Sequence, residues 1–94
     1  MKNTVSTFLS MKQNGERLTE ITSYDYTTAK LVEKAGINAI LVGDSLGMTM
    51  MGYDTTLPVT MEDMIHHSAC VVRACENTMV IMDMPVSYTH LTLP

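Results

Sequence analysis

The pattern of apolar and polar positions along the chain predicts strands and helices in turn. Residues 18–23 alternate apolar and polar side chains and include Ile and Thr, which favours a short strand. Apolar residues then recur at helical spacing as far as Ala35, and Gly36 is a typical helix end. The same reading of the whole chain predicts strands at 18–23, 37–42 and 79–82 and helices at 3–13, 27–35 and 60–75.

Two further features complete this outline. Thr60 and Asp63 form a Thr-x-x-Asp box, in which the hydroxyl and the carboxylate satisfy exposed amides at the start of the last helix. Residues 43–58 show no sustained period and are rich in Gly, Asp, Ser, Thr and Met, so we expect a long, ordered loop there.

The order of these elements is typical of parallel β/α units joined by right-handed crossovers. Parallel sheets are normally covered on both faces, and a closed barrel of eight such units takes about 250 residues. The chain has 94 residues and supplies about three units. We therefore expect an α/β fold that is the N-terminal portion of a larger protein.

Composition narrows the class of protein. The chain carries 6 basic and 10 acidic residues, a net charge of −4, and 46% of it is hydrophobic, which argues for a packed globular protein. The six basic residues are scattered, so we expect no nucleic-acid partner. The apolar runs are far shorter than the roughly 18 residues of a spanning helix, and no signal peptide is recognisable, so we expect no membrane contact.

The cysteines and methionines have ordinary interpretations. Cys70 and Cys75 lie five residues apart on a predicted helix, where they cannot pair, and they fit thiols of a reducing cytoplasm. Ten methionines are many, and we expect most of them to be adaptable core filler, with a Met-rich binding surface as the alternative.

Candidate chemistry gathers where the predicted strands end, because ligands of parallel α/β folds bind at the carboxyl ends of strands. Asp44 and Asp83 follow two strands closely, and Asp25 lies two residues beyond a third. Carboxylates are hard oxygen ligands that suit Mg²⁺, which proteins hold with one or two of them plus water and substrate oxygens. The alternative for each aspartate is that it caps the following turn or helix.

The loop after residue 42 resembles a phosphate-binding loop only in its glycines. Gly47 and Gly52 have the spacing of a P-loop, but Tyr53 and Asp54 stand where Lys and Ser or Thr are needed. The loop does offer flexible backbone with exposed amides beside the hydroxyl of Ser45, a combination that could hold the carboxylate of a small substrate.

Histidine chemistry is weakly indicated. His66 and His67 are adjacent, so on a helix they point about 100° apart and do not easily share a metal ion. Glu62 and His66 share a helix face, which surface pairing explains without a metal.

Three runs of residues, with their order and spacing, resemble the ketopantoate hydroxymethyltransferase family: 22–26 (TSYDY), 41–48 (LVGDSLGM) and 56–60 (TLPVT). The likeness extends from about residue 4 to residue 85. It implies a (β/α)₈ TIM barrel of the phosphoenolpyruvate/pyruvate type, of which residues 1–85 form the first three units, a homo-oligomer that is a decamer of two pentameric rings, and a place in the cytoplasm.

The resemblance also implies a reaction. A hydroxymethyl group passes from 5,10-methylenetetrahydrofolate to 3-methyl-2-oxobutanoate and gives 2-dehydropantoate, the first step of pantothenate and hence coenzyme A biosynthesis. Asp44 and Asp83 align with the family's Mg²⁺ ligands, and Asp44, Ser45 and Asp83 with its contacts to the 2-oxo acid. The family's substrate lysine, third metal carboxylate and glutamate base are expected beyond residue 94.

Two other functions remain open, and one segment departs from the family. A related phosphoenolpyruvate mutase or isocitrate lyase type of magnesium enzyme shares the Gly-Asp-Ser segment, and a small acidic interaction module would need no catalysis. Residues 86–94 fit no motif of the family. They match the in-frame translation of a sequencing adapter, so we expect them to be a non-native tail.

Overall fold

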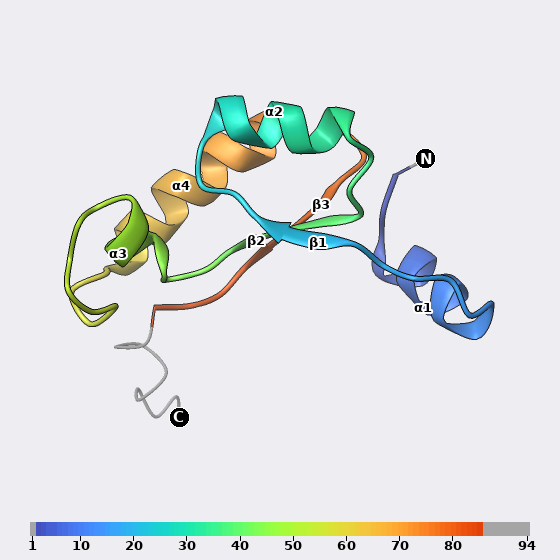
Figure 1. The fold of residues 1–94 in the computed structure, drawn as a ribbon, viewed down its shortest axis with the longest axis horizontal. Helices are drawn as coiled ribbons and strands as arrows, with labels where there is room; N and C mark the ends of the chain where they lie inside the picture. The colour runs from blue at the N-terminus through green and yellow to red at the C-terminus, as the bar shows by residue number, and fades with distance from the viewer. Residues whose placement is uncertain (1, 86–94) are drawn as a thin grey trace.

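Strands and helices alternate along residues 2–85, the part of the chain that the computed structural model describes (Figure 1). The predicted tail at 86–94 lies outside the described residues. In chain order the elements are α1 (Val5–Gln13), β1 (Glu20–Thr22), α2 (Tyr26–Lys34), β2 (Ala39–Val42), α3 (Leu46–Thr49), α4 (Met61–Ala74) and β3 (Met79–Met82).

The three strands form one parallel sheet in the order β1-β2-β3, which confirms the predicted parallel β/α units. In the register of the sheet, Ile40 lies beside Ile21 on one side and Val80 on the other. All three strands run in the same direction, so their carboxyl ends lie at one edge, at the left in Figure 1, where α3 also lies.

Helices α2 and α4 cover one face of the sheet (Figure 1). Alternate residues of β2, Ile40 and Val42, are fully buried under these helices. The core around them is otherwise made of small, branched and thioether side chains: Ala29, Val32, Leu46, Val59, Met64, Val71 and Ala74. Thr60 and Asp63 form the predicted capping box of α4, with Thr60 Oγ1 accepting from the Asp63 amide at 3.1 Å.

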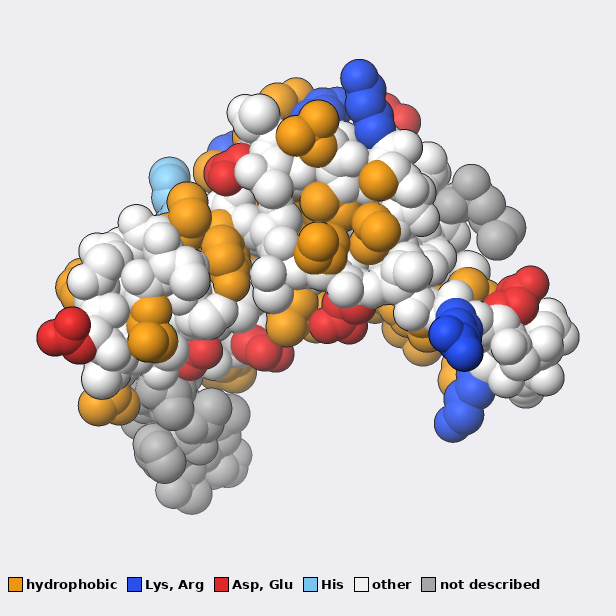
Figure 2. Space-filling view, viewed as in Figure 1, with side chains coloured by type: hydrophobic (Ala, Val, Ile, Leu, Met, Phe, Trp, Pro, Cys, Tyr) orange, Lys and Arg blue, Asp and Glu red, His pale blue; other side chains and the backbone are white. Residues whose placement is uncertain are grey.

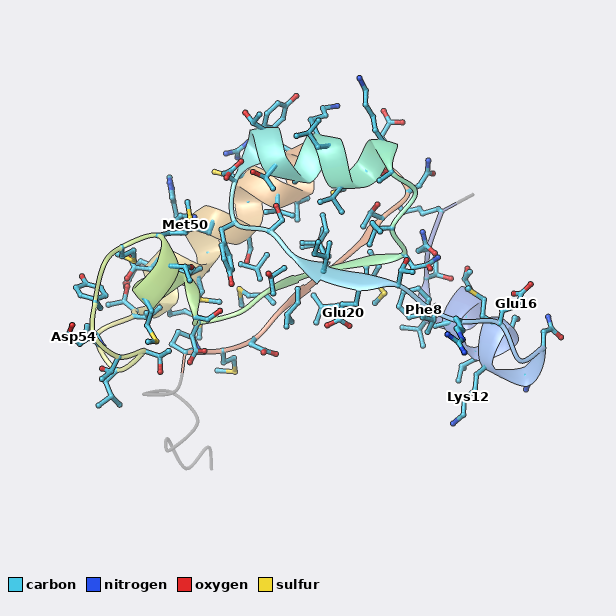
Figure 3. All side chains as sticks on the ribbon, in the orientation of Figure 1. Phe8, Lys12, Glu16, Glu20, Met50 and Asp54 are labelled. Carbon is cyan, nitrogen blue, oxygen red and sulfur yellow. The ribbon has the colours of Figure 1, made fainter. Side chains whose placement is uncertain are left out.

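The other face of the sheet has no covering layer among residues 2–85. Leu41 lies between the buried residues Ile40 and Val42 of β2, pairs with Ile81 of β3 in the register, and like Ile81 stays partly exposed. In Figure 3 the Glu20 side chain of β1 lies on the side of the sheet away from α2.

The structure differs from the sequence prediction in two places. The predicted loop contains α3, a single helical turn of four residues that is too short to show a period. Among the methionines from Met48 to Met82 only Met64 is fully buried, while Met48, Met50 and Met51 are exposed. The expectation that most methionines fill the core is therefore wrong for the described residues. Figure 2 shows apolar side chains scattered over the face of the molecule that is turned to the viewer.

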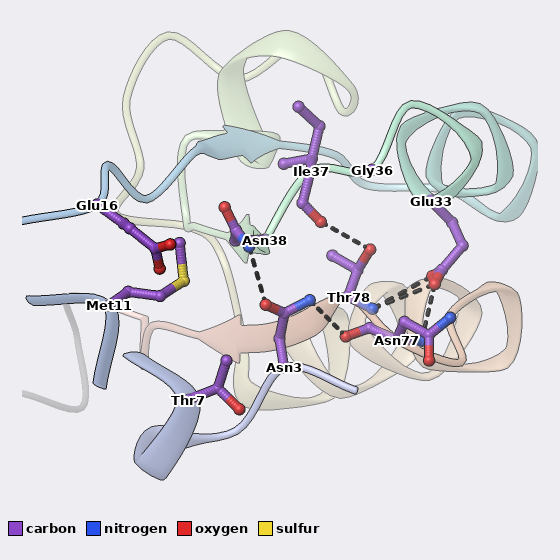
Figure 4. A pocket seen from close by; sticks show the side chains of 10 residues that line it. All are labelled: Asn3, Thr7, Met11, Glu16, Glu33, Gly36, Ile37, Asn38, Asn77 and Thr78. Carbon is purple, nitrogen blue, oxygen red and sulfur yellow. Dashed lines mark hydrogen bonds between the residues drawn. The ribbon is translucent and has the colours of Figure 1, made fainter. Parts of the chain in front are cut away.

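A polar pocket of about 400 Å³ lies at the amino edge of the sheet, the edge opposite α3 (Figure 4). Asn3 joins the segment before α1 to this edge, because its Nδ2 donates to the Asn77 carbonyl at 2.8 Å and its Oδ1 accepts from Asn38 Nδ2 at 2.9 Å. The polar side chains of the pocket are thus largely bonded to the chain itself, and the pocket has a structural role.

Glu33 of α2 binds backbone amides at the same amino edge of the sheet. Its carboxylate accepts from the amides of Asn77 at 2.7 Å, Thr78 at 3.1 Å and Glu76 at 3.2 Å, and so fixes the turn between α4 and β3. Partial burial alone raises the pKa of Glu33, but the hydrogen bonds from Asn77, Thr78 and Glu76 outweigh it and bring the pKa below its ordinary value of 4.5.

Substitution of Glu33 by Gln tests this contact. A carboxyl with a lowered pKa in the folded state stabilises the fold above the pKa of the unfolded state, and this stability is lost as the pH falls through the folded pKa. We expect Glu33→Gln to cost about 1 kcal/mol at pH 7 and the difference from wild type to shrink below pH 4.5. Thermal unfolding of the full-length protein between pH 3 and pH 7 measures this, with Glu20→Gln on exposed β1 as control; a difference that is independent of pH contradicts it.

The uncovered face of the sheet predicts the behaviour of the 94-residue chain by itself. The radius of gyration is 14.4 Å, above the about 12 Å of a compact domain of this length. We expect the isolated chain to associate through its apolar face and strand edges. Size-exclusion chromatography and thermal circular dichroism check this, and a monomer with a cooperative unfolding transition would support the small interaction module instead.

Candidate active site at the carboxyl ends of the strands

Gly43 lies at the centre of the polar groups at the carboxyl edge. A methyl group at its Cβ position would be 3.9 Å from Asp83 Oδ2 and 3.9 Å from Ser45 Oγ. The absence of a side chain at Gly43 therefore leaves a space with a carboxylate on one side and a hydroxyl on the other. Its φ angle is not positive, so the backbone alone does not require glycine.

Parallel pairing brings Asp83 to this space. Val42 pairs with Met82 in the register, and the Asp83 amide donates to the Val42 carbonyl at 3.1 Å, which continues the ladder one residue beyond β3. Asp83 therefore lies beside Gly43. This neighbourhood could not be read from the sequence, where the two residues are 40 positions apart.

The turn into α3 positions Ser45. The Leu46 amide donates to the Gly43 carbonyl at 3.2 Å, the Gly47 amide to the Asp44 carbonyl at 3.0 Å, and the Met48 amide to the Ser45 carbonyl at 3.0 Å. The expectation of a flexible loop with exposed amides is therefore wrong for these three amides, because the helical turn uses them. The Ser45 side chain makes no capping hydrogen bond to α3 and is exposed.

The three candidate aspartates have different environments. Asp25 is the N-cap of α2, where its carboxylate accepts from the Thr28 amide at 2.7 Å and the Thr28 hydroxyl at 3.1 Å. Capping therefore explains Asp25. Asp83 is exposed and Asp44 half-buried, and within residues 2–85 neither carboxylate accepts a hydrogen bond from the chain, so both are open to a ligand.

The donor set of this edge fits a magnesium ion. Within the described residues, no group of three or more His, Cys, Asp or Glu side chains comes together as a metal site. Asp44 and Asp83 follow the ends of the adjacent strands β2 and β3, and the Asp83 carboxylate lies beside the space at Gly43. Mg²⁺ is commonly held by one or two carboxylates with water and substrate oxygens.

Two residues of the site escaped the sequence analysis. The Tyr24 hydroxyl lies 2.7 Å from Ser45 Oγ, and His67 Nδ1 lies 2.7 Å from the Tyr24 carbonyl. Tyr24 lies two residues beyond the end of β1, and this position near a strand end was the signal that could have found it. No local pattern could have found His67, because its partner is 43 residues away.

Packing explains why a Gly-Asp-Ser-Leu-Gly turn occurs together with the Thr-Leu-Pro-Val-Thr run. A side chain on Gly47 would overlap Val59 Cγ2, and Val59 is fully buried. The Tyr53 amide also donates to the Gly47 carbonyl at 2.8 Å. The second run thus packs on α3 and holds the turn that carries Ser45.

Residues 2–85 thus define a parallel β/α protein, with the Ser45 hydroxyl and the Asp44 and Asp83 carboxylates just beyond the carboxyl ends of two of its strands. A family profile for ketopantoate hydroxymethyltransferase matches residues 2–93. The chain belongs to the ketopantoate hydroxymethyltransferase family, as the sequence resemblance predicted.

Curated relatives agree with this family. Proteins named 3-methyl-2-oxobutanoate hydroxymethyltransferase are 64% identical in Clostridium novyi and 59% in Enterococcus faecalis, each over 85 residues, or 90% of this chain and 31% of the relative. The protein of that name from Dehalococcoides mccartyi strain 195 is 54% identical over 92 residues, 98% of this chain and 33% of the relative. The chain thus spans about a third of the length of these relatives.

The two glycines provide a matched pair of substitutions. Gly43→Ala places a methyl group between Ser45 and Asp83 without a clash, so we expect an unfolding temperature within about 2 °C of wild type and metal affinity lowered about tenfold or more. Gly47→Ala drives a methyl group into Val59, and we expect it to cost about 1–3 kcal/mol.

Thermal unfolding of the full-length variants measures stability, and electron paramagnetic resonance of Mn²⁺, which suits the same oxygen ligands as Mg²⁺, measures metal binding. Wild-type metal affinity in Gly43→Ala would show that the space beside Gly43 is not the metal site.

Proposed function

We propose that the full-length protein that contains this chain transfers a hydroxymethyl group from 5,10-methylenetetrahydrofolate to 3-methyl-2-oxobutanoate and so forms 2-dehydropantoate. The observation that supports this most directly is the space beside Gly43, which has the Ser45 hydroxyl on one side and the Asp83 carboxylate on the other. A 2-oxo acid needs a hydrogen-bond donor for its carboxylate, which is the role of the Ser45 hydroxyl. It also needs a cation for its carboxylate and keto oxygens, which the Asp83 carboxylate would help to hold.

Asp44 and Asp83 would hold Mg²⁺ at this edge. The ion supplies Lewis-acid polarisation of the carboxylate and keto oxygens of the 2-oxo acid, which makes the proton at C3 more acidic. The carboxylates belong to adjacent strand ends whose backbone is fixed by the sheet, as in the hydrogen bond from the Asp83 amide to the Val42 carbonyl. Such ligands keep their places without rearrangement of the chain.

Ser45 binds the substrate in this proposal. Its hydroxyl is exposed at the start of α3 and faces the space beside Gly43. A hydroxyl that donates to the substrate carboxylate fixes the orientation of the 2-oxo acid, so that C3 is presented to the base and to the folate carbon. The base, a substrate lysine and a third carboxylate would come from the rest of the protein, beyond residue 94.

The whole protein is proposed to be a cytoplasmic (β/α)₈ barrel that assembles as a decamer. The open face of the sheet supports the barrel, because Leu41 and Ile81 need further strands and side chains to cover them. Family membership favours the hydroxymethyltransferase over a phosphoenolpyruvate mutase or isocitrate lyase type of enzyme. In the described part of the chain, no helix combines the length and apolarity needed to cross a membrane.

Substitution of Asp83 tests the metal ligand and the reaction together. In the full-length protein we expect Asp83→Ala to lower Mg²⁺-dependent exchange of deuterium at C3 of 3-methyl-2-oxobutanoate by about a hundredfold or more while the fold is kept. Nuclear magnetic resonance follows this exchange without folate. The matched control is Asp54→Ala, an exposed aspartate of the loop labelled in Figure 3. Unchanged exchange in Asp83→Ala would refute the ligand assignment.

A further inference from the structure

Three residues from three separate segments are joined by hydrogen bonds at the edge of the proposed site. The Tyr24 hydroxyl lies 2.7 Å from Ser45 Oγ, and the backbone carbonyl of the same tyrosine lies 2.7 Å from His67 Nδ1. Tyr24 follows β1, Ser45 precedes α3 and His67 belongs to α4. The distance between the hydroxyls is typical of an O–H···O hydrogen bond, and the distance from His67 is at the short end of the range for N–H···O bonds.

The direction of the hydrogen bond between His67 and the Tyr24 carbonyl is fixed by chemistry. A backbone carbonyl only accepts hydrogen bonds, so His67 Nδ1 carries the hydrogen and donates to Tyr24. This bond ties the backbone of Tyr24 to α4. The ring of Tyr24 also packs against the buried core, so both ends of the residue are held.

The acidity of the two hydroxyls favours one direction for the hydrogen bond between Tyr24 and Ser45. Either hydroxyl could donate in this bond, and the greater acidity of a phenol over an aliphatic alcohol favours Tyr24 as the donor and Ser45 as the acceptor. With one lone pair of Ser45 Oγ occupied in this way, the hydrogen of Ser45 is free to point to another acceptor. Hydrogen bonds in such a row also polarise and strengthen one another.

We propose that Tyr24 and His67 are positioning residues that turn the Ser45 hydroxyl into a directed donor for the carboxylate of the 2-oxo acid. The inference rests on the proposed function and deepens it. Ser45 is exposed and makes no hydrogen bond to cap α3, so without Tyr24 its hydroxyl rotates freely and bonds to water. The substrate would then lose an oriented donor, while the magnesium ligands and the proton acceptor keep their places.

Removal of the Tyr24 hydroxyl is the first test. Tyr24→Phe keeps the ring that packs on the core, and in the full-length enzyme we expect the KM for 3-methyl-2-oxobutanoate to rise about tenfold. The KM for 5,10-methylenetetrahydrofolate stays at the wild-type value. The matched control is Tyr26→Phe, which removes the hydroxyl of an exposed tyrosine whose ring contacts Lys30. An unchanged KM for the 2-oxo acid in Tyr24→Phe overturns the proposal.

A double-mutant cycle separates positioning from simple structural support. If Tyr24 acts through Ser45, Tyr24→Phe has no further effect on the KM for the 2-oxo acid once Ser45→Ala has been made. Effects that multiply in the double variant overturn the proposal, because they show that Tyr24 acts independently of Ser45.

His67 is tested by loss and rescue of its donor. We expect His67→Ala to raise the KM for the 2-oxo acid, and His67→Asn, whose amide nitrogen takes a similar position to Nδ1, to restore most of it. The control is His66→Ala, at the exposed neighbouring position. A His67→Asn enzyme as impaired as His67→Ala overturns the role of His67.

The outcomes distinguish this inference from the proposed function. A folded wild-type protein that transfers no hydroxymethyl group refutes the proposed function. An active wild-type enzyme whose Tyr24→Phe variant has wild-type KM values refutes the positioning role alone.

Discussion

The parallel pairing of β2 with β3 is the constraint on which the rest of the structure depends. It continues one residue beyond β3, through the hydrogen bond from the Asp83 amide to the carbonyl of Val42 at the end of β2, and so brings Asp83 beside Gly43. A shift of one residue would turn Asp83 to the face covered by helices. Burial of Ile40 and Val42 beneath α2 and α4 prevents such a shift, so the core that fixes the register also fixes the site.

Local signals predicted the elements of the fold well, because each element is encoded by nearby residues. The capping box of Thr60 and Asp63 and the stop at Gly36 mark helix ends through contacts within a few positions. The family motif likewise pointed to Asp44, Ser45 and Asp83, and the structure places the last two on either side of one space. Their chemical roles remain predictions.

Sequence reasoning failed where contacts between residues far apart in the chain determine the structure. The bond between His67 and the Tyr24 carbonyl joins residues 43 positions apart, and no periodicity records it. The amides beside Ser45 were expected to be exposed, but a single turn of helix uses those of Leu46, Gly47 and Met48. The methionines were expected inside, yet Met48, Met50 and Met51 lie on the surface of the described residues, because exposure depends on which layers surround an element.

The two edges of the sheet show how the environment of a carboxylate determines its role. At the amino edge, the carboxylate of Glu33 accepts from three backbone amides and stabilises a turn. At the carboxyl edge, the carboxylate of Asp83 accepts no hydrogen bond from residues 2–85 and lies beside a space that a single methyl group would fill. A carboxylate already satisfied by the chain has little to offer a cation, whereas one held in place by the sheet and unpaired can bind it. The same asymmetry distinguishes Asp25, which caps α2, from Asp83, and it agrees with the proposed ligand site at the carboxyl edge and a stabilising role for the amino edge.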